Sequence, residues 1–449
     1  MSRVVICLLA CCGVFAACTS SSPRDAVPPT ASSRVDPDLA AFIATIRAVD
    51  NHTHANSVAS PDPDSDALPL DGIAPFELPA PLLPTSPNWL AAYKTLYKYP
   101  HDDLSDAHMN ELRATMKDVA KAQGDKFPTW VLDQVGTEVM LANRVAMGPG
   151  LSAPRFRWVS FADPLLLPLP TTAEAATTPD RQKLFPMEDK LLQRYLSDLK
   201  VASRPATLDA YLKTVVTPTL EAQRRDGCVA VKFEAAYLRA LDFGEVALGP
   251  ASAIYAKYAG GGVPSHADYK ALQDFLFRYI AAEAGRLGMA VHIHSFEGAG
   301  NYFQIAGADP MLLEPAFNDP ALRNTNFVII HGGGVYAARA GALLWKPNVY
   351  VDASMLPVLY PPSRLAGIFR SWLAQYPEKV LFGSDASAFG PDAGWELTAW
   401  IGGRNARSAL ASALSDMIRD GEITRARADE IARMVMRANA AKLYKLALN

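Results

Sequence analysis

Short apolar runs recur along the chain and alternate with amphipathic stretches. Eight runs have the length and the β-branched or aromatic content of buried parallel strands, and they lie at residues 46–51, 138–142, 157–161, 229–233, 290–293, 327–330, 349–352 and 380–382. Residues 269–287 and 363–376 instead show helical spacing. Alternation of this kind implies right-handed βαβ units, and eight such units close into a barrel. The sequence therefore predicts an α/β fold, a (β/α)8 TIM barrel over residues 39–449 with a short helix before its first strand.

Two connections, residues 55–137 and 164–222, are too long to be simple loops. The first opens with a stretch rich in proline and aspartate and continues with helical segments around 89–97 and 106–123. An insertion after the first strand lies at the C-terminal face, where barrel enzymes keep their chemistry. We interpret it as a lid-like insertion over the site. A surface decoration or a dimer contact is the alternative interpretation.

The N-terminus has the pattern of a targeting segment. Arg3 is followed by apolar residues 4–14 and then by the sequence from Phe15 to Cys18, so residues 1–17 resemble a bacterial lipoprotein signal peptide. This predicts lipidation of Cys18 and export to the periplasm or the cell exterior. Ordinary secretory cleavage is the alternative, because Phe15 stands where such signals usually carry leucine. A retained span is disfavoured, because the run is shorter than the roughly 20 residues that a membrane requires.

Residues 18–38 are rich in serine and proline, which predicts a disordered tether. The composition is otherwise that of a globular protein, with 50% hydrophobic and 20% charged residues and a formal charge of -3. The sequence contains no Lys/Arg cluster of the kind that binds nucleic acid. We therefore expect a small-molecule substrate and membrane contact only through the lipid anchor. The sequence leaves homo-oligomerisation open.

Five of the eight histidines stand at or beside the ends of the apolar runs. His52 and His54 are separated by one residue, so in a strand both side chains emerge on one face, about 6–7 Å apart, and both can reach one ion. Asp50 lies one pleat below His52, where a carboxylate can orient a ligand ring. The alternative is a pair of solvated loop histidines.

His292 and His294 repeat this spacing at the end of a later strand. We choose His294 as the metal ligand because it is nearer the strand end, and we interpret His292 as a hydrogen-bonded core residue. His331 precedes three glycines, a string that also occurs in serine esterases, but the chain has no Gly-x-Ser-x-Gly elbow. We therefore expect His331 to act in catalysis, as a second-metal ligand or as an electrostatic and general-acid partner.

The last predicted strand ends in Gly383-Ser384-Asp385. An unhindered carboxylate there can bind a metal and take a proton from the water that the metal activates, so Asp385 is a predicted ligand and catalytic base. A helix N-cap is the alternative. Lys232 and Glu234 share one face of the fourth strand. A carboxylated lysine that bridges two metals, a bridging glutamate and a plain ion pair all remain open.

As a set, these strand-end residues resemble the amidohydrolase superfamily, specifically its amidohydrolase-related (amidohydrolase 2) branch. Residues 136–144 and 349–352 fit the same pattern, and the resemblance covers roughly residues 47–390. It implies a divalent metal, with zinc as the first choice, and either one ion or two. It also implies that His331 lies near the attacked group. The ligands that it implies are His52, His54, His294 and Asp385.

We therefore expect a metal-dependent hydrolase that cleaves an amide, ester or lactone-type bond. Arg144, Tyr237 and Arg239 follow predicted strands and are candidates for binding a substrate carboxylate or carbonyl. A metal-dependent decarboxylase of the same fold is one alternative, because the branch includes such enzymes. A phosphoesterase is disfavoured, because Asp385-Ala386-Ser387 lacks the histidine of its Asp-x-His motif. A non-catalytic, lipid-anchored metal- or solute-binding protein is the third alternative.

Overall fold

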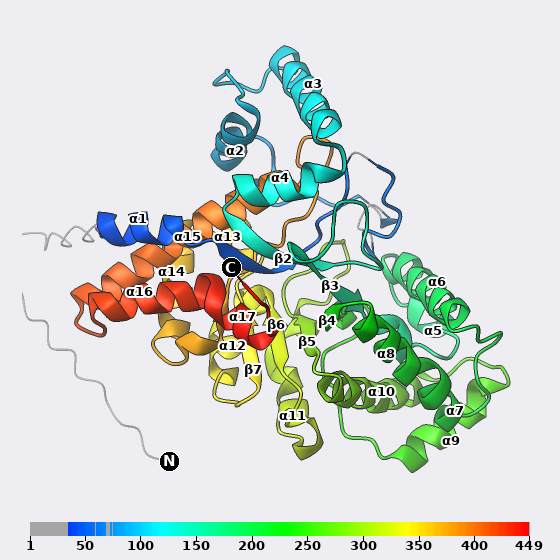
Figure 1. Ribbon diagram of the computed structural model, residues 1–449. Helices are drawn as coiled ribbons and strands as arrows, with labels where there is room; N and C mark the ends of the chain where they lie inside the picture. Colours follow the sequence, from blue (N-terminus) through cyan, green and yellow to red (C-terminus); the bar gives the residue numbers. More distant parts are fainter. Residues whose placement is uncertain (1–34, 59, 69–71, 74, 449) are drawn as a thin grey trace, which may run out of the picture. The chain divides into compact units, whose positions relative to one another are not determined.

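The computed structural model describes residues 35–449 except 59, 69–71, 74 and 449 (Figure 1). The predicted signal peptide, Cys18 and most of the predicted tether lie outside the described residues. Helix α1 spans Pro37–Thr45, and the Asp36 side chain caps it by accepting hydrogen bonds from the backbone N–H groups of Asp38 and Leu39. The prediction of a tether up to residue 38 was therefore wrong by two residues, because a capped helix already begins at Pro37.

The strands form one parallel eight-stranded sheet in sequence order, β1 to β8. Their bounds are β1 Ala48–Thr53, β2 Thr137–Asn143, β3 Phe156–Phe161, β4 Cys228–Phe233, β5 Ala290–His294, β6 Phe327–Ile330, β7 Val349–Asp352 and β8 Val380–Leu381. The last strand meets the first through bonds from the Asn51 N–H to the Phe382 carbonyl and from the Asp385 N–H to the His52 carbonyl, both 2.9 Å. The predicted (β/α)8 barrel is confirmed.

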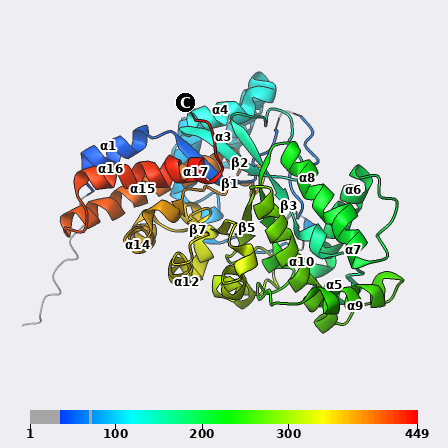
Figure 2. The same cartoon turned by 60° about the horizontal axis from the view of Figure 1, so that its bottom comes forward.

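Helices surround the strands, as Figures 1 and 2 show from two directions. Helices α4, α8, α10 and α12 pack against β2, β4, β5 and β7 respectively. The remaining long helices include α14 and α15, which pack against each other. The helices after α1 are α2 Pro87–Tyr97, α3 Asp106–Gln123, α4 Phe127–Gln134, α5 Thr172–Ala175, α6 Arg181–Asp198, α7 Leu208–Tyr211, α8 Thr217–Arg225, α9 Leu248–Ala259, α10 His266–Arg286, α11 Glu314–Phe317, α12 Ala337–Leu343, α13 Leu356–Leu359, α14 Pro362–Leu373, α15 Trp395–Arg419, α16 Arg425–Arg433 and α17 Asn439–Leu443.

The two long connections contain helices α2 to α8. Helices α2 and α3, which were expected, and α4, which was not, belong to the insertion after β1, and α4 packs against β2 (Figure 1). Helices α5 to α8 belong to the connection between β3 and β4. Among the described residues, no helix has both the length and the apolar content needed to cross a membrane.

The C-terminal end of the chain fills the barrel interior near the amino-terminal ends of the strands. Val49, Val139 and Val328, which lie in the first half of their strands, form an apolar cluster with Ala440 and Tyr444. Every residue of β1, β4, β5 and β6 is buried, as expected for parallel strands covered on both faces. Because this half of the interior is apolar, the polar side chains of the barrel gather at the carboxyl ends of the strands, where the candidate site lies.

Candidate functional site

The first strand and the turn after the last strand bring three predicted metal ligands together. His52 lies in β1, His54 follows it directly, and Asp385 follows β8. The Nε2 atoms of His52 and His54 lie 3.3 and 3.6 Å from Asp385 Oδ1. One ligand atom from each of the three residues lies within 4.8 Å of the others. The hydrogen bond from the Asp385 N–H to the His52 carbonyl fixes this arrangement at the closure of the barrel.

His294, at the end of β5, lines the same cavity but does not belong to the close group of ligand atoms formed by His52, His54 and Asp385. Its Nδ1 lies 3.3 Å from Glu234 Oε2, whereas its Nε2 is buried and has no hydrogen-bond partner. The other oxygen of Glu234 accepts a hydrogen bond of 2.5 Å from Lys232 Nζ, which also lies 3.5 Å from His52 Nε2. Among the interpretations left open for Lys232 and Glu234, the structure shows the ion pair, in which Glu234 also contacts the His294 ring.

His331 begins the glycine turn after β6. Gly332, Gly333 and Gly334 all have positive φ angles of 53–76°, and His331 itself has φ 65°. Such angles are unfavourable for a residue with a Cβ, so the site holds His331 in a strained backbone conformation. The His331 and His294 ring centroids are 4.8 Å apart, and His331 Nδ1 lies 3.7 Å from Asp385 Oδ2.

Hydrogen bonds with Asp352 and Ser354 stabilise the strained backbone conformation of His331. The sequence alone assigned no role to these two residues. Asp352, the last residue of β7, accepts hydrogen bonds at Oδ1 from the backbone N–H groups of His331 (3.1 Å) and Ser354 (2.9 Å). The Ser354 hydroxyl donates to the same carboxylate and lies 2.9 Å from His331 Nδ1. The position of Asp352 at a strand end was the available signal in the sequence.

Burial is the largest influence on the titration of the imidazoles. It lowers the pKa of His294 to about 4, although Glu234 opposes the shift, and it lowers the pKa of His52 and of His331 well below the usual value. Burial acts in the same direction on His54, but the carboxylates of Asp66 and Asp385 outweigh it and raise its pKa. At neutral pH, His52, His294 and His331 are therefore uncharged and have a free lone pair.

These donors suit a divalent metal. Metal ligands must be deprotonated, and imidazole and carboxylate are common ligands of zinc and related ions. His294 Nε2 and Asp385 Oδ1 are buried and accept or donate no hydrogen bond. Polar atoms of this kind are rare in proteins and call for a partner. A cation placed between the rings and the carboxylate would supply that partner.

A cavity of about 680 Å³ opens above the centre. Its floor includes His54, His294, His331 and Asp385. One wall comes from the insertion after β1, which contributes Asn56, Ser65, Asp66, Leu68, Phe76 and Leu82. The structure therefore places the start of the 55–137 insertion at the site, as the lid or wall interpretation requires, while helices α2 to α4 contribute no residue to the lining.

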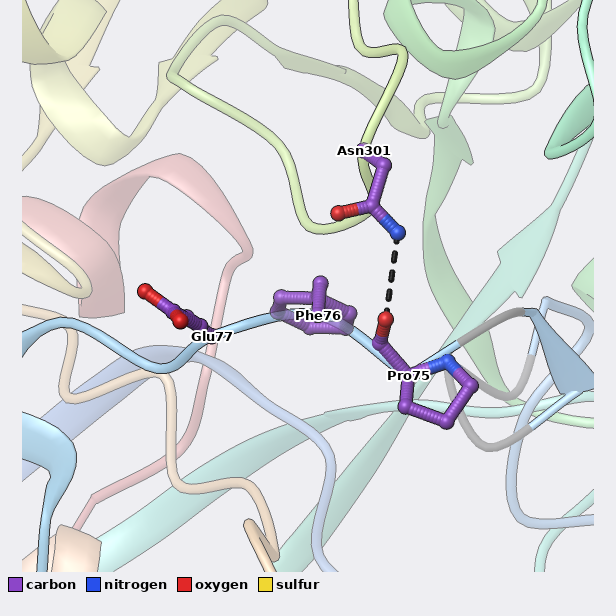
Figure 3. A pocket seen from close by; sticks show the side chains of 5 residues that line it. Pro75, Phe76, Glu77 and Asn301 are labelled. Atoms are coloured by element: carbon purple, nitrogen blue, oxygen red, sulfur yellow. Dashed lines mark hydrogen bonds between the residues drawn. The ribbon is translucent and has the colours of Figure 1, made fainter.

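A second hollow of about 620 Å³ lies outside this cavity, and Figure 3 shows it. Pro75, Phe76 and Glu77 of the insertion face Gly300 and Asn301 of the segment after β5. Asn301 Nδ2 donates a hydrogen bond of 3.1 Å to the Pro75 carbonyl. Phe76 lines both hollows, so its side chain separates the outer one from the inner cavity.

The predicted substrate-binding arginines do not line the cavity. Arg144 is fully buried and donates to the carbonyls of Ala55 and Ala146 and to the carboxylate of Asp62. Arg239 donates to Asp274 at 2.7 Å and lies over the ring of Phe243. The prediction was wrong for both, because carboxylates and carbonyls from distant segments already occupy these guanidinium groups.

Tyr237, in contrast, does line the cavity, and its ring centroid lies 4.8 Å from that of His294. His292 shares a hydrogen bond of 2.7 Å with the Tyr444 hydroxyl, in agreement with the core interpretation. Asp50 does not contact the His52 ring. Its carboxylate accepts a hydrogen bond from the Ser384 N–H instead, and His52 Nδ1 has no hydrogen-bond partner among the described residues.

Comparison with solved structures shows the same fold in proteins with different activities. A proposed metal-dependent hydrolase from Lactobacillus casei aligns with a TM-score of 0.63 and 18% identity, over 91% of this chain and 97% of its own. A uronate isomerase from Thermotoga maritima aligns with a TM-score of 0.58 and 14% identity, over 91% and 96%. A glucuronate isomerase from Caulobacter crescentus gives 0.55 and 13%, over 94% and 96%. At these identities the likeness extends to the fold alone.

Sequence comparison adds two matches. Protein fluG of Emericella nidulans is 29% identical over 122 residues, which is 27% of this chain and only 14% of the length of fluG. An amidohydrolase family model matches residues 252–446, a span that contains His294, His331 and Asp385. This match supports the predicted resemblance to the amidohydrolase superfamily over the C-terminal half of the barrel.

Proposed function

We propose that this protein is a metal-dependent hydrolase that cleaves an amide, ester or lactone bond of a small molecule. The convergence of His52, His54 and Asp385 at the base of a cavity is the observation that carries the proposal. These residues and His294 would hold the metal, for which we propose zinc because imidazole and carboxylate ligands suit it. When bound, such an ion lowers the pKa of a water molecule and polarises the oxygen of the attacked bond.

Asp385 is the residue to which we assign proton transfer. Burial raises the pKa of its carboxyl to about 6, although His54 and Lys232 oppose the shift. A base with a pKa near neutrality can take a proton from the attacking water and return it to the leaving group. The left-handed backbone at Asp385, with φ 57°, turns the chain just after β8 and places the carboxylate between the histidines.

Tyr237 is our candidate for stabilising the negative charge that develops on the attacked oxygen. Burial raises the pKa of Tyr237, so its hydroxyl keeps its proton and can donate a hydrogen bond. The Ser354 hydroxyl donates to Asp352, so the bond between Ser354 and His331 leaves the proton on His331 Nδ1. A neutral His331 with a free Nε2 lone pair fits a metal ligand better than a general acid or a hydrogen-bond donor to the attacked oxygen.

The experiment must separate hydrolysis from the other reactions of this fold. Purified, metal-loaded protein would be assayed against esters, lactones and amides, with uronates and aromatic acids included and with product analysis for isomers and carbon dioxide. We expect hydrolysis products only. Isomerisation or decarboxylation without hydrolysis would refute the proposal, as would inactivity of the metal-loaded protein across the whole panel.

The Asp385→Asn variant tests the mechanism within that assay. The amide keeps the shape of the side chain and one ligand oxygen but cannot act as a base. We expect it to retain much of the metal and to lose turnover by about 100-fold or more. The matched control is Asp392→Asn, which should remain active. Asp392 also lies between β8 and α15, but its carboxylate pairs with Arg113. Full activity in Asp385→Asn would end the proposed role of Asp385.

We also propose that the protein is exported and anchored by a lipid on Cys18, on the pattern of residues 1–17. Fractionation of cells that express the full chain tests this. The wild-type protein should sediment with membranes and Cys18→Ser should not. Equal partition of the two proteins would contradict the anchor.

A further inference from the structure

The cavity above the candidate metal centre combines aromatic walls with negative charge. Phe76, Tyr237, Phe296, Tyr360 and Phe389 line it. Among the described lining residues there is no lysine and no arginine, but there are four carboxylates. Away from the proposed metal, a cation beside these acids would be attracted both by their charge and by the faces of the rings.

Three of the four lining carboxylates have a basic partner. Asp385 lies beside His52 and His54, Asp66 Oδ2 lies 3.5 Å from His54 Nδ1, and Glu234 pairs with Lys232. Glu297 is the exception. Its carboxylate takes part in no hydrogen bond or ion pair with any described residue, and its Oε2 is buried.

The absence of a side chain at Gly334 leaves space for the carboxylate of Glu297. Glu297 follows Phe296 after β5, and its Oε2 lies against Gly334 of the glycine turn, where an added Cβ would come within 2.1 Å of this oxygen. Arg364 lies over the ring of Tyr360, with its guanidinium carbon 3.6 Å from the centroid, but forms no ion pair with Glu297. A buried carboxylate oxygen without a hydrogen-bond partner costs stability and calls for a partner.

We propose that Glu297 binds a cationic nitrogen of the substrate, such as an ammonium group, inside this aromatic-walled cavity. The substrate class is then a small molecule with an apolar body, a hydrolysable bond and an amine. The hydrolysable bond in this substrate class rests on the proposed function. The recognition of the cation by Glu297 does not. The charge-assisted hydrogen bond to Glu297 would orient the substrate, and the rings would cover its apolar part.

The test measures binding, so that it does not depend on turnover. The affinities of benzylammonium, benzyl alcohol and benzoate for the metal-loaded protein would be determined by calorimetry. These probes share a ring and differ in charge. We expect benzylammonium to bind more tightly than benzyl alcohol, whereas the carboxylate of benzoate can bind the metal instead and serves to report that contribution. Glu297→Gln should lose about 10-fold to 100-fold of the benzylammonium affinity and keep that for benzyl alcohol.

Glu77→Gln is the matched control, because Glu77 is an exposed carboxylate at the outer hollow (Figure 3) and removing it changes the net charge equally. Its affinity for benzylammonium should equal that of the wild type. Equal binding of benzylammonium and benzyl alcohol by the wild type, or an equal loss in both variants, would overturn the proposal. Cation binding without hydrolysis would refute the proposed function alone, and hydrolysis without cation selectivity would refute this inference alone.

Discussion

His54 Nδ1 lies 3.5 Å from Oδ2 of Asp66, a residue of the segment inserted after the first strand. The opposite ring nitrogen, Nε2, faces Asp385. A carboxylate on the far side of a metal-binding imidazole fixes its orientation and makes it a better ligand. The insertion therefore contributes both a wall of the cavity and a contact that orients His54.

Replacing Asp66 with Asn should weaken metal binding by about 10-fold to 100-fold, because an amide is a poorer acceptor than a carboxylate. Competition with a chelator measures the dissociation constant. Asp64→Asn is the control, since Asp64 lies in the same insertion but pairs with Arg194. Unchanged metal affinity in Asp66→Asn would show that the contact does not support the ligand.

Arg144 should matter for stability and not for substrate binding. Removing the guanidinium in Arg144→Met leaves Asp62 buried without its partner, and breaking a buried pair of this kind costs about 3–5 kcal/mol. Thermal unfolding should show a clear decrease in Tm, while the KM of the folded protein stays near the wild-type value.

The half-exposed Arg194–Asp64 pair provides the comparison, because Arg194→Met should change Tm little. A raised KM with an unchanged Tm in Arg144→Met would restore the substrate-binding role that the sequence suggested.

The comparison of Arg144 with His52 shows what local spacing can and cannot predict. The strands were predictable because parallel strands buried on both faces are apolar runs, and the ends of parallel strands meet at one face. That rule was enough to predict that His52 and Asp385 lie together. The partner of a buried arginine, in contrast, comes from a distant loop. No periodicity in the sequence predicts that Arg144 forms an ion pair with Asp62.

The same reasoning explains why Asp66 and Glu297 were missed. Both lie in irregular segments, where the sequence carries no signal for side-chain direction. Their roles depend on how two loops meet over the barrel, as in the hydrogen bond between Asn301 and Pro75. The C-terminal residues that fill the barrel near the amino-terminal ends of the strands were also missed, because they follow the last predicted strand.

Glu188 on α6 offers a test of buried charge away from the centre. Both of its carboxylate oxygens are buried without a hydrogen bond. Burial raises its pKa well above the usual value of 4.5, and Asp163 and Glu234 add to the shift. Because the folded state holds this proton more tightly than the unfolded state, the contribution of Glu188 to stability is full below pH 4.5 and is lost as the pH rises through the folded-state pKa.

The Glu188→Gln variant does not titrate. The Tm of the variant minus that of the wild type should therefore increase by about 2 °C or more between pH 5 and pH 8. The exposed Glu77→Gln control should show no such trend. A difference that is flat or falls with pH would contradict a proton held on Glu188 in the folded protein.

The most direct test of the central claim is the divalent metal content of the purified protein and of a His294→Ala variant, measured by mass spectrometry after dialysis against metal-free buffer. His292→Ala, which alters a buried histidine on the same strand outside the cavity, is the control. We predict near-stoichiometric metal in the wild type and the control and a large loss in His294→Ala. Equal metal content in all three proteins, or none in the folded wild type after loading with zinc, would contradict a metal centre at the strand ends.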